Sequence, residues 1–180
     1  MAKRRPQNGK SKLPRSKPVG RSPAQLRVRK VAGENAWEFI HPRCALDRMD
    51  DLDEVHKMIE ADEIDIAIDE LRWLLNGCSD FIEAHKTLGE LALQEDDIAL
   101  ARGHFGYAFQ IGKKALDAAG CQGPLPYRLA ANKAFYEAGK GLAHCLKQLG
   151  KRKMLSDVIR TLAQCDPTDP LAVGKMCEGH

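Results

Sequence analysis

Apolar residues recur every three or four positions from Leu52 onward, which is the spacing of an amphipathic helix. The first stripe consists of Leu52, Val55, Met58 and Ile59, and a second one ends at Leu75. Further stripes of the same period lie in 82–92, 98–111 and 155–162. The body contains no useful stretch in which apolar and polar residues alternate as in a strand. The pattern therefore predicts an all-α chain.

Two neighbouring stripes are related by a shift of 34 positions, which aligns Ala67 with Ala101 and Leu71 with Phe105. A period of about 34 residues is typical of tetratricopeptide repeats (TPRs), in which each repeat is one helix–turn–helix unit. Residues 82–115 resemble such a repeat. The five positions that match the family pattern are Leu88, Gly89, Ala101, Phe105 and Ala108, and the three that depart from it are His85, Ala92 and Lys113.

Segments 48–81 and 136–169 resemble the same repeat less closely. Together the three segments imply an all-α fold, a short TPR-like α-solenoid of about three helix–turn–helix units within a helical domain at 48–175. Twenty extra residues, 116–135, form an insertion between the second and third units. An ordinary helical bundle would show the same three-and-four spacing, so the shared register is what favours the stack.

The resemblance implies a concave groove lined by the first helix of every unit. Its expected protein-binding residues are Met49, Leu52, His56, Ile59, Glu60, Glu83, Lys86, Glu90, Leu93, Gln94, Glu137, Lys140, His144, Lys147 and Gln148. The alternative is that these residues are simply solvated helix faces. Some family members bind a C-terminal carboxylate through a clamp of basic and amide side chains. Because Glu90, Glu137 and Gly141 stand near Lys86 in that pattern, we do not expect such a clamp.

Charge divides the chain into a basic arm and an acidic body. Residues 1–30 have a net charge of +11, and the other 150 residues have 17 basic and 25 acidic groups. The arm is poor in large apolar residues, so we expect it to be disordered, with residues 31–47 as an extended linker packed on the body. The basic residues of the arm are Lys3, Arg4, Arg5, Lys10, Lys12, Arg15, Lys17, Arg21, Arg27, Arg29 and Lys30.

These features support two functions. The first is a non-catalytic protein-interaction adaptor that binds a protein, a peptide or a partner helix in the groove. The alternative is a nucleic-acid or ribosome-associated factor, whose arm at residues 1–30 makes nonspecific phosphate contacts. A third role for the arm is to neutralise the acidic segment 47–70 of its own chain.

The remaining chemistry is sparse. Six cysteines occur without a Cys-x-x-Cys pair, and we interpret them as free thiols in helices. No phosphate-binding glycine loop, hydrolase elbow or metalloprotease motif is present, so we expect no enzymatic activity, no catalytic residues, no cofactor and no metal. The basic N-terminus lacks the apolar run of a signal peptide, and no segment is apolar enough to cross a bilayer. We therefore expect a cytoplasmic protein that makes no membrane contact.

Overall fold

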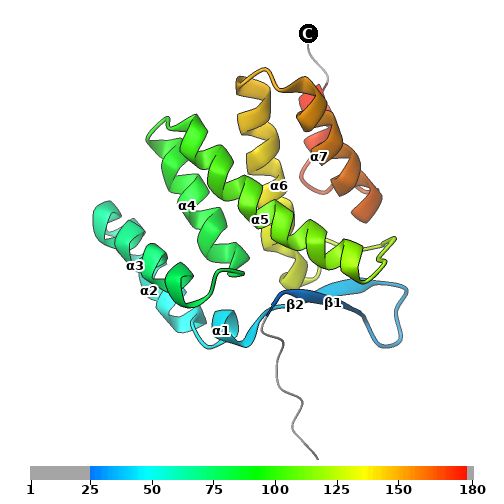
Figure 1. Ribbon diagram of the computed structural model, residues 1–180, viewed down its shortest axis with the longest axis horizontal. Helices are drawn as coiled ribbons and strands as arrows, with labels where there is room; N and C mark the ends of the chain where they lie inside the picture. The colour runs from blue at the N-terminus through cyan, green and yellow to red at the C-terminus, as the bar shows by residue number, and fades with distance from the viewer. Residues whose placement is uncertain (1–24, 178–180) are drawn as a thin grey trace, which may run out of the picture.

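The computed structural model describes residues 25–177 of the 180-residue chain. These residues are mostly helical, with one two-stranded sheet (Figure 1). The elements in chain order are β1 (Arg27–Lys30), β2 (Trp37–Ile40), α1 (Arg43–Leu46), α2 (Met49–Glu60), α3 (Ile64–Gly77), α4 (Ile82–Gln94), α5 (Ile98–Ala118), α6 (Ala130–Gln148), α7 (Arg152–Cys165) and the short 3-10 helix η1 (Val173–Cys177). The prediction of a predominantly helical chain is confirmed.

Successive helices pack as hairpins, α2 with α3, α4 with α5, and α6 with α7. Helix α5 also packs along α6, and α4 contacts both α3 and α6 (Figure 1). The apolar core accordingly has two clusters, which meet at α4. Leu88 and Leu91 of α4 belong to the cluster with α2 and α3, whereas Ile82 and Ala92 belong to the cluster with α5 and α6. A helix that buries two faces must be apolar around most of its circumference, as α4 is.

The turn inside each hairpin has the same backbone geometry. Asp62, Asp96 and Gly150 adopt left-handed conformations, with φ of 63°, 58° and 65°. Each turn is closed by an N–H that donates across it to a carbonyl five residues earlier, the longer of the two bonds of a Schellman motif. These bonds join Glu63 to Met58, Asp97 to Ala92 and Lys151 to Leu146, each at 2.9 Å. The first two turns are separated by the 34 positions that relate the apolar stripes.

The expectation that residues 1–30 are wholly disordered is wrong at Arg27–Lys30, which form strand β1. The strand pairs antiparallel with β2, so that Val28 stands opposite Phe39. The hairpin is held in place because Leu26, which precedes β1, and Phe39 of β2 are both buried in the core that α5 and α6 share. Residues 1–24 of the arm lie outside the described part of the chain.

Residues 31–47 and 116–135 are also more structured than expected. The first segment contains β2 and the short helix α1, which begins directly after Pro42, so it is extended only in part. In the second, α5 continues to Ala118 and α6 already begins at Ala130, leaving 119–129 as the connection. Leu125 of this connection is fully buried, which explains why an apparent insertion is held against the core.

The interpretation of all cysteines as free thiols is wrong for Cys44 and Cys78, which form a disulfide with their Cα atoms 5.6 Å apart. Helix α1 places Cys44 against the end of α3, where Cys78 follows the last helical residue. Cys121, Cys145 and Cys165 are free. Because disulfides are rare in cytosolic proteins, this bond weighs against the expected cytoplasmic location.

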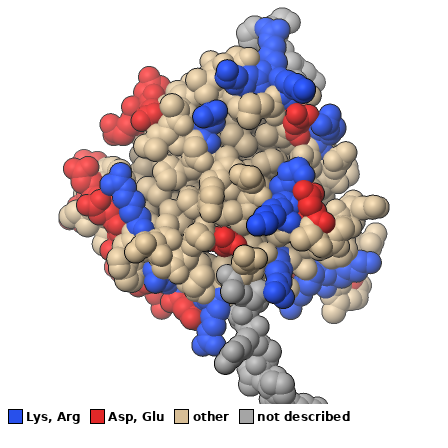
Figure 2. All heavy atoms as spheres, in the orientation of Figure 1, with Lys and Arg blue, Asp and Glu red and all other residues tan. Residues whose placement is uncertain are grey.

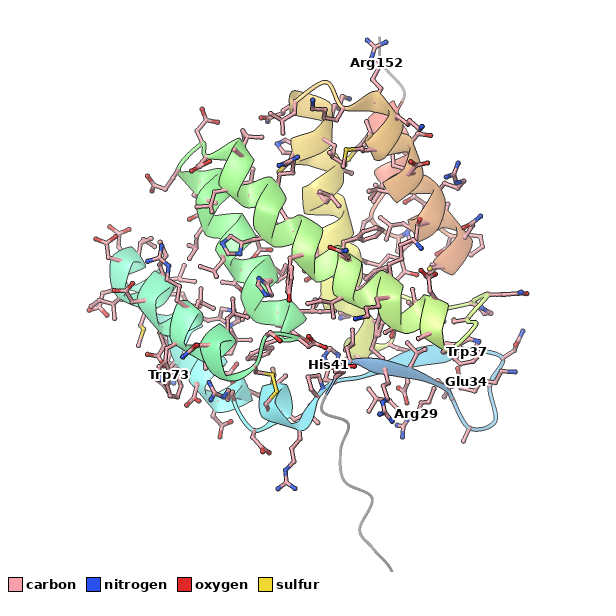
Figure 3. The ribbon with its side chains drawn as sticks, viewed as in Figure 1. Arg29, Glu34, Trp37, His41, Trp73 and Arg152 are labelled. Carbon is pink, nitrogen blue, oxygen red and sulfur yellow. A yellow bond between two sulfur atoms is a disulfide. The ribbon has the colours of Figure 1, made fainter. Side chains whose placement is uncertain are left out.

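Charged side chains are segregated on the surface. Figure 2 shows Asp and Glu gathered over α2 and α3, and Lys and Arg over the β1–β2 hairpin and the last helices. Part of the hairpin charge is neutralised locally, because Arg29 pairs with Glu38 at 2.7 Å and Arg128 pairs with Glu34. Arg29 and Glu34 are labelled in Figure 3.

Candidate functional site

A cavity of about 430 Å³ lies between α4 and α6. Leu93 and Phe105 give it an apolar floor, and the Phe105 ring packs directly on Gly141, which also lines the cavity. The end of the chain supplies another wall, because η1 packs on α6 and α7 and places Met176 at the cavity together with Leu171. The cavity therefore combines an apolar floor with polar walls, which is the usual composition of a binding site.

An ion-pair network joins α4 to α6, and two of its members, Glu90 and Glu137, line the cavity. The Lys86 ammonium lies 3.3 Å from a Glu90 carboxylate oxygen and 3.4 Å from one of Glu137. Burial favours the neutral amine, but the two carboxylates outweigh it and raise the pKa of Lys86 above its usual value. The Tyr127 hydroxyl donates to Glu137 at 3.0 Å, and burial together with this carboxylate raises the pKa of Tyr127. The positive charge of Lys86 is thus balanced by carboxylates of the protein itself.

A second pair of polar side chains, His41 and Glu83, lies at the start of α4. Nε2 of His41 contacts the Ala131 carbonyl at 2.9 Å, and Nδ1 lies 3.6 Å from Glu83 Oε1. His41 directly follows β2 and lies below α4 and α5 in the view of Figure 3. Nδ1 of His41 and Oε2 of Glu83 are both buried and have no hydrogen-bond partner among residues 25–177. The pair joins the hairpin segment to α4 and α6.

The structure brings together five of the fifteen predicted groove residues around the cavity, namely Glu90, Leu93, Glu137, Lys140 and His144. Lys86 does not line the cavity, but it forms ion pairs with two of them, Glu90 and Glu137. Leu52 does not line a groove, because its side chain is 2% exposed and packs in the core between α2 and its neighbours. The other α2 residues of the prediction, Met49, His56, Ile59 and Glu60, do not line the α4–α6 cavity, and neither do Glu83, Gln94, Lys147 and Gln148.

Sequence reasoning missed five residues that line the cavity: Phe105, Tyr127, Gly141, Leu171 and Met176. Tyr127 and Leu171 lie outside the segments predicted to be repeats, so a groove assigned by repeat position could not include them. Gly141 had a usable signal, since a glycine within a helix usually marks a close approach. A Cβ at this position would come within 2.6 Å of the Phe105 ring.

Two histidines form a separate polar cluster between α4 and α5. The Nδ1 atoms of His85 and His104 are 3.3 Å apart, and the Tyr107 ring lies 4.6 Å from the ring of His85, centroid to centroid. Burial and the neighbouring His104 lower the pKa of His85 to about 4. Burial, followed by Arg72, lowers the pKa of His104. In residues 25–177, no group of three His, Cys, Asp or Glu side chains is arranged to hold a metal ion.

The residues of the basic arm are divided between two regions. Arg27, Arg29 and Lys30 lie on β1, where the Lys30 ammonium is 5.5 Å from the centre of the Trp37 ring. The other eight, from Lys3 to Arg21, lie outside the described residues. No helix in the described part of the chain is long and apolar enough to cross a membrane.

A scan of family models, a search of curated proteins and a search of solved structures each found no significant match to this chain.

Proposed function

We propose that this protein is a non-catalytic interaction adaptor that binds a peptide or a partner helix in the α4–α6 cavity. The observation that carries the proposal is the cavity of about 430 Å³, around which residues from two predicted repeat units converge. Glu90 and Leu93 come from the first helix of one unit, and Lys140 and His144 come from the first helix of the next. Convergence of first helices on one hollow surface is what a TPR-like stack would produce.

The repeated turn geometry supports the TPR-like arrangement. The left-handed residues Asp62, Asp96 and Gly150 occupy the same position within each unit once the insertion is allowed for. Small residues also lie at helix crossings, because a Cβ at Gly89 would come within 2.8 Å of the Phe105 ring. In this interpretation the α2–α3 hairpin is the first unit, although its groove residues stay apart from the cavity.

The walls of the cavity define the ligand that would fit. Leu93, Phe105 and Met176 suit an apolar anchor side chain. Glu90 on one wall suits a basic residue beside the anchor, and Lys140 on the other wall suits an acidic one. A free C-terminal carboxylate is a poor ligand here, because Lys86 is already held by Glu90 and Glu137.

A displayed library of random twelve-residue peptides, selected against the full chain, tests this proposal. The peptides recovered are measured by isothermal titration calorimetry against the wild type and against Leu93→Arg. We expect this substitution to weaken binding by about tenfold or more, because it places an unpaired charge on the apolar floor. Leu100→Arg is the matched control, since Leu100 is an exposed leucine of α5 that does not line the cavity.

Failure to recover any binding peptide, or equal loss of binding in both variants, would contradict the proposal. Mobility-shift assays with RNA and DNA across a salt series test the alternative function of the basic arm. Binding that falls steeply with salt and is unaffected by Leu93→Arg would favour that alternative.

A further inference from the structure

The outer edge of strand β1 has backbone groups that lack partners among residues 25–177. On β2, Trp37 and Phe39 direct their backbone groups away from β1: the Phe39 N–H donates to Asn132 Oδ1 at 3.0 Å, and Asn132 Nδ2 donates to the Trp37 carbonyl at 3.1 Å. In an antiparallel pair, residues opposite such positions also point outward. Val28 and Lys30 are the residues opposite, so their N–H and C=O groups lie on the outer edge of β1.

One backbone group on this edge already has a hydrogen-bond partner, the side chain of Asp80. Its carboxylate accepts the N–H of Leu26 at 3.3 Å, two residues before Val28 on the same edge. No described residue plays that part for Val28 or Lys30. The opposite edge of the sheet differs, because both outward backbone groups of Trp37 have partners. The Trp37 N–H donates to the Pro124 carbonyl, and the Trp37 carbonyl accepts from Asn132 Nδ2. Three outward backbone groups of β2, the Phe39 N–H and both groups of Trp37, thus have partners, whereas those of Val28 and Lys30 on β1 have none among residues 25–177.

A second cavity, of about 480 Å³, lies beside the outer edge of β1. It is bounded by β1 and by one face of α5, whose C-terminal part lies over the hairpin (Figure 1). Ile111, Ala115 and Ala118 form an apolar floor from α5. A strand placed about 4.8 Å from β1 would direct every second side chain toward that floor. The cavity shares no lining residue with the α4–α6 cavity.

The charges around this cavity indicate the kind of strand it suits. Arg27 and Lys114 are exposed at its rim and form no ion pair with another described residue. Asp80 is the one carboxylate among its lining residues, and it is occupied by Leu26. The rim thus favours an acidic strand, and the alanine floor leaves room for side chains of moderate size.

We propose that β1 and α5 form a second peptide-binding site, which receives an acidic, extended segment of a partner protein as a third strand. Main-chain hydrogen bonds to Val28 and Lys30 would supply part of the affinity. Alternating apolar side chains over Ala115 and Ala118 would supply the fit, and acidic residues between them would pair with Arg27 and Lys114.

The experiment uses the full chain and a fluorescein-labelled, end-blocked probe of sequence Glu-Val-Asp-Val-Glu-Val-Glu. Fluorescence anisotropy compares it with a probe in which every acidic residue is replaced by Lys. We expect the acidic probe to bind at least about tenfold more tightly. Ala118→Trp should weaken its binding about tenfold, whereas Ala99→Trp, at an exposed alanine of α5 outside the cavity, should not. Lys114→Glu should weaken binding more than Lys153→Glu, which makes the same charge change elsewhere.

Amide hydrogen exchange measured by NMR provides the structural readout. In the free protein, the amide of Arg29 should be protected by β2, whereas those of Val28 and Lys30 should exchange rapidly. The acidic probe should protect Val28 and Lys30. Protection of these two amides without the probe would mean that the arm already covers the edge, and protection that grows with protein concentration would indicate a second copy of the chain. Either result, or equal effects of Ala118→Trp and Ala99→Trp, would overturn the proposal.

Discussion

Gly89 of α4 lies directly against the Phe105 ring of α5, and a Cβ on Gly89 would come within 2.8 Å of two ring carbons. Both residues are buried, so the ring has little room to move. Phe105 meets Gly141 of α6 in the same way on another side. One aromatic ring is thus fitted between the backbones of two helices that each present a glycine.

Gly89→Ala should therefore destabilise the protein although alanine favours helices. The overlap with Phe105 is expected to cost about 1–3 kcal/mol, and the higher helix propensity of alanine returns at most about 1 kcal/mol. Urea unfolding followed by circular dichroism measures the change. Gly103→Ala in α5 is the matched control: nothing lies within 4 Å of its added Cβ, so it should be stabilising. Equal effects of the two substitutions would contradict this packing.

Removing the disulfide should lower the free energy of unfolding. Cys44 and Cys78 are 34 residues apart, and a cross-link that closes a loop of this size typically contributes about 3–4 kcal/mol. The double variant Cys44→Ala, Cys78→Ala and the chemically reduced wild type should lose similar amounts in urea unfolding. A variant with alanine at Cys121 and Cys165 should respond to reductant as the wild type does, because those thiols are free.

Asn132 should be among the costliest polar residues to replace. Its fully buried amide accepts from Phe39 and donates to the carbonyls of Trp37 and Pro126. Asn132→Leu keeps a similar volume but leaves three backbone groups without partners, and we expect a loss of about 2–4 kcal/mol. Trp37 fluorescence, recorded with Trp73 replaced by Phe, reports whether the hairpin detaches first. Asn76→Leu, at an exposed asparagine, should change stability little.

Acidification should destabilise the α4–α5 hairpin through His85. Burial and His104 hold the pKa of His85 at about 4 in the folded protein, against 6.5 for an ordinary histidine. Between these two values the unfolded chain binds more protons, so stability that is present above pH 6.5 is lost as the pH falls toward 4.

Allowing for partial exposure, this contribution amounts to about 1–2 kcal/mol between pH 7 and pH 5. Urea unfolding at both pH values compares the wild type with His85→Gln, which should lose less stability on acidification. His56→Gln is the control because His56 is exposed on α2. A wild-type pH dependence that His85→Gln leaves unchanged would show that His85 does not titrate in this way.

Local periodicity predicted the features that depend on local structure. The apolar stripes located the helices of the body, and the resemblance placed Gly89 and Phe105 within one segment, 82–115, where the structure packs them together. The shift of 34 positions that relates the apolar stripes also relates the turns at Asp62 and Asp96.

Features that depend on distant pairings could not be found in this way. The partner of β1 lies beyond a turn within a segment that reads as linker, and Asn132 meets β2 across more than ninety positions. Cysteine spacing alone did not indicate that α1 carries Cys44 to the end of α3. The candidate site was predicted in part for the same reason: Glu90 and Lys140 were expected from the predicted repeat pattern, whereas Tyr127 and Met176 reach the cavity from outside the predicted repeat segments.

The three hairpin turns share a backbone conformation while differing in residue type, since two use aspartate where the third uses glycine. What recurs in this chain is therefore a set of torsion angles, and many sequences can satisfy it at modest energetic cost. A hairpin that meets this requirement can vary its exposed side chains without changing how its two helices are placed. Carboxylates can therefore gather over α2 and α3, and basic side chains over the last helices, although the turns within these hairpins have the same geometry.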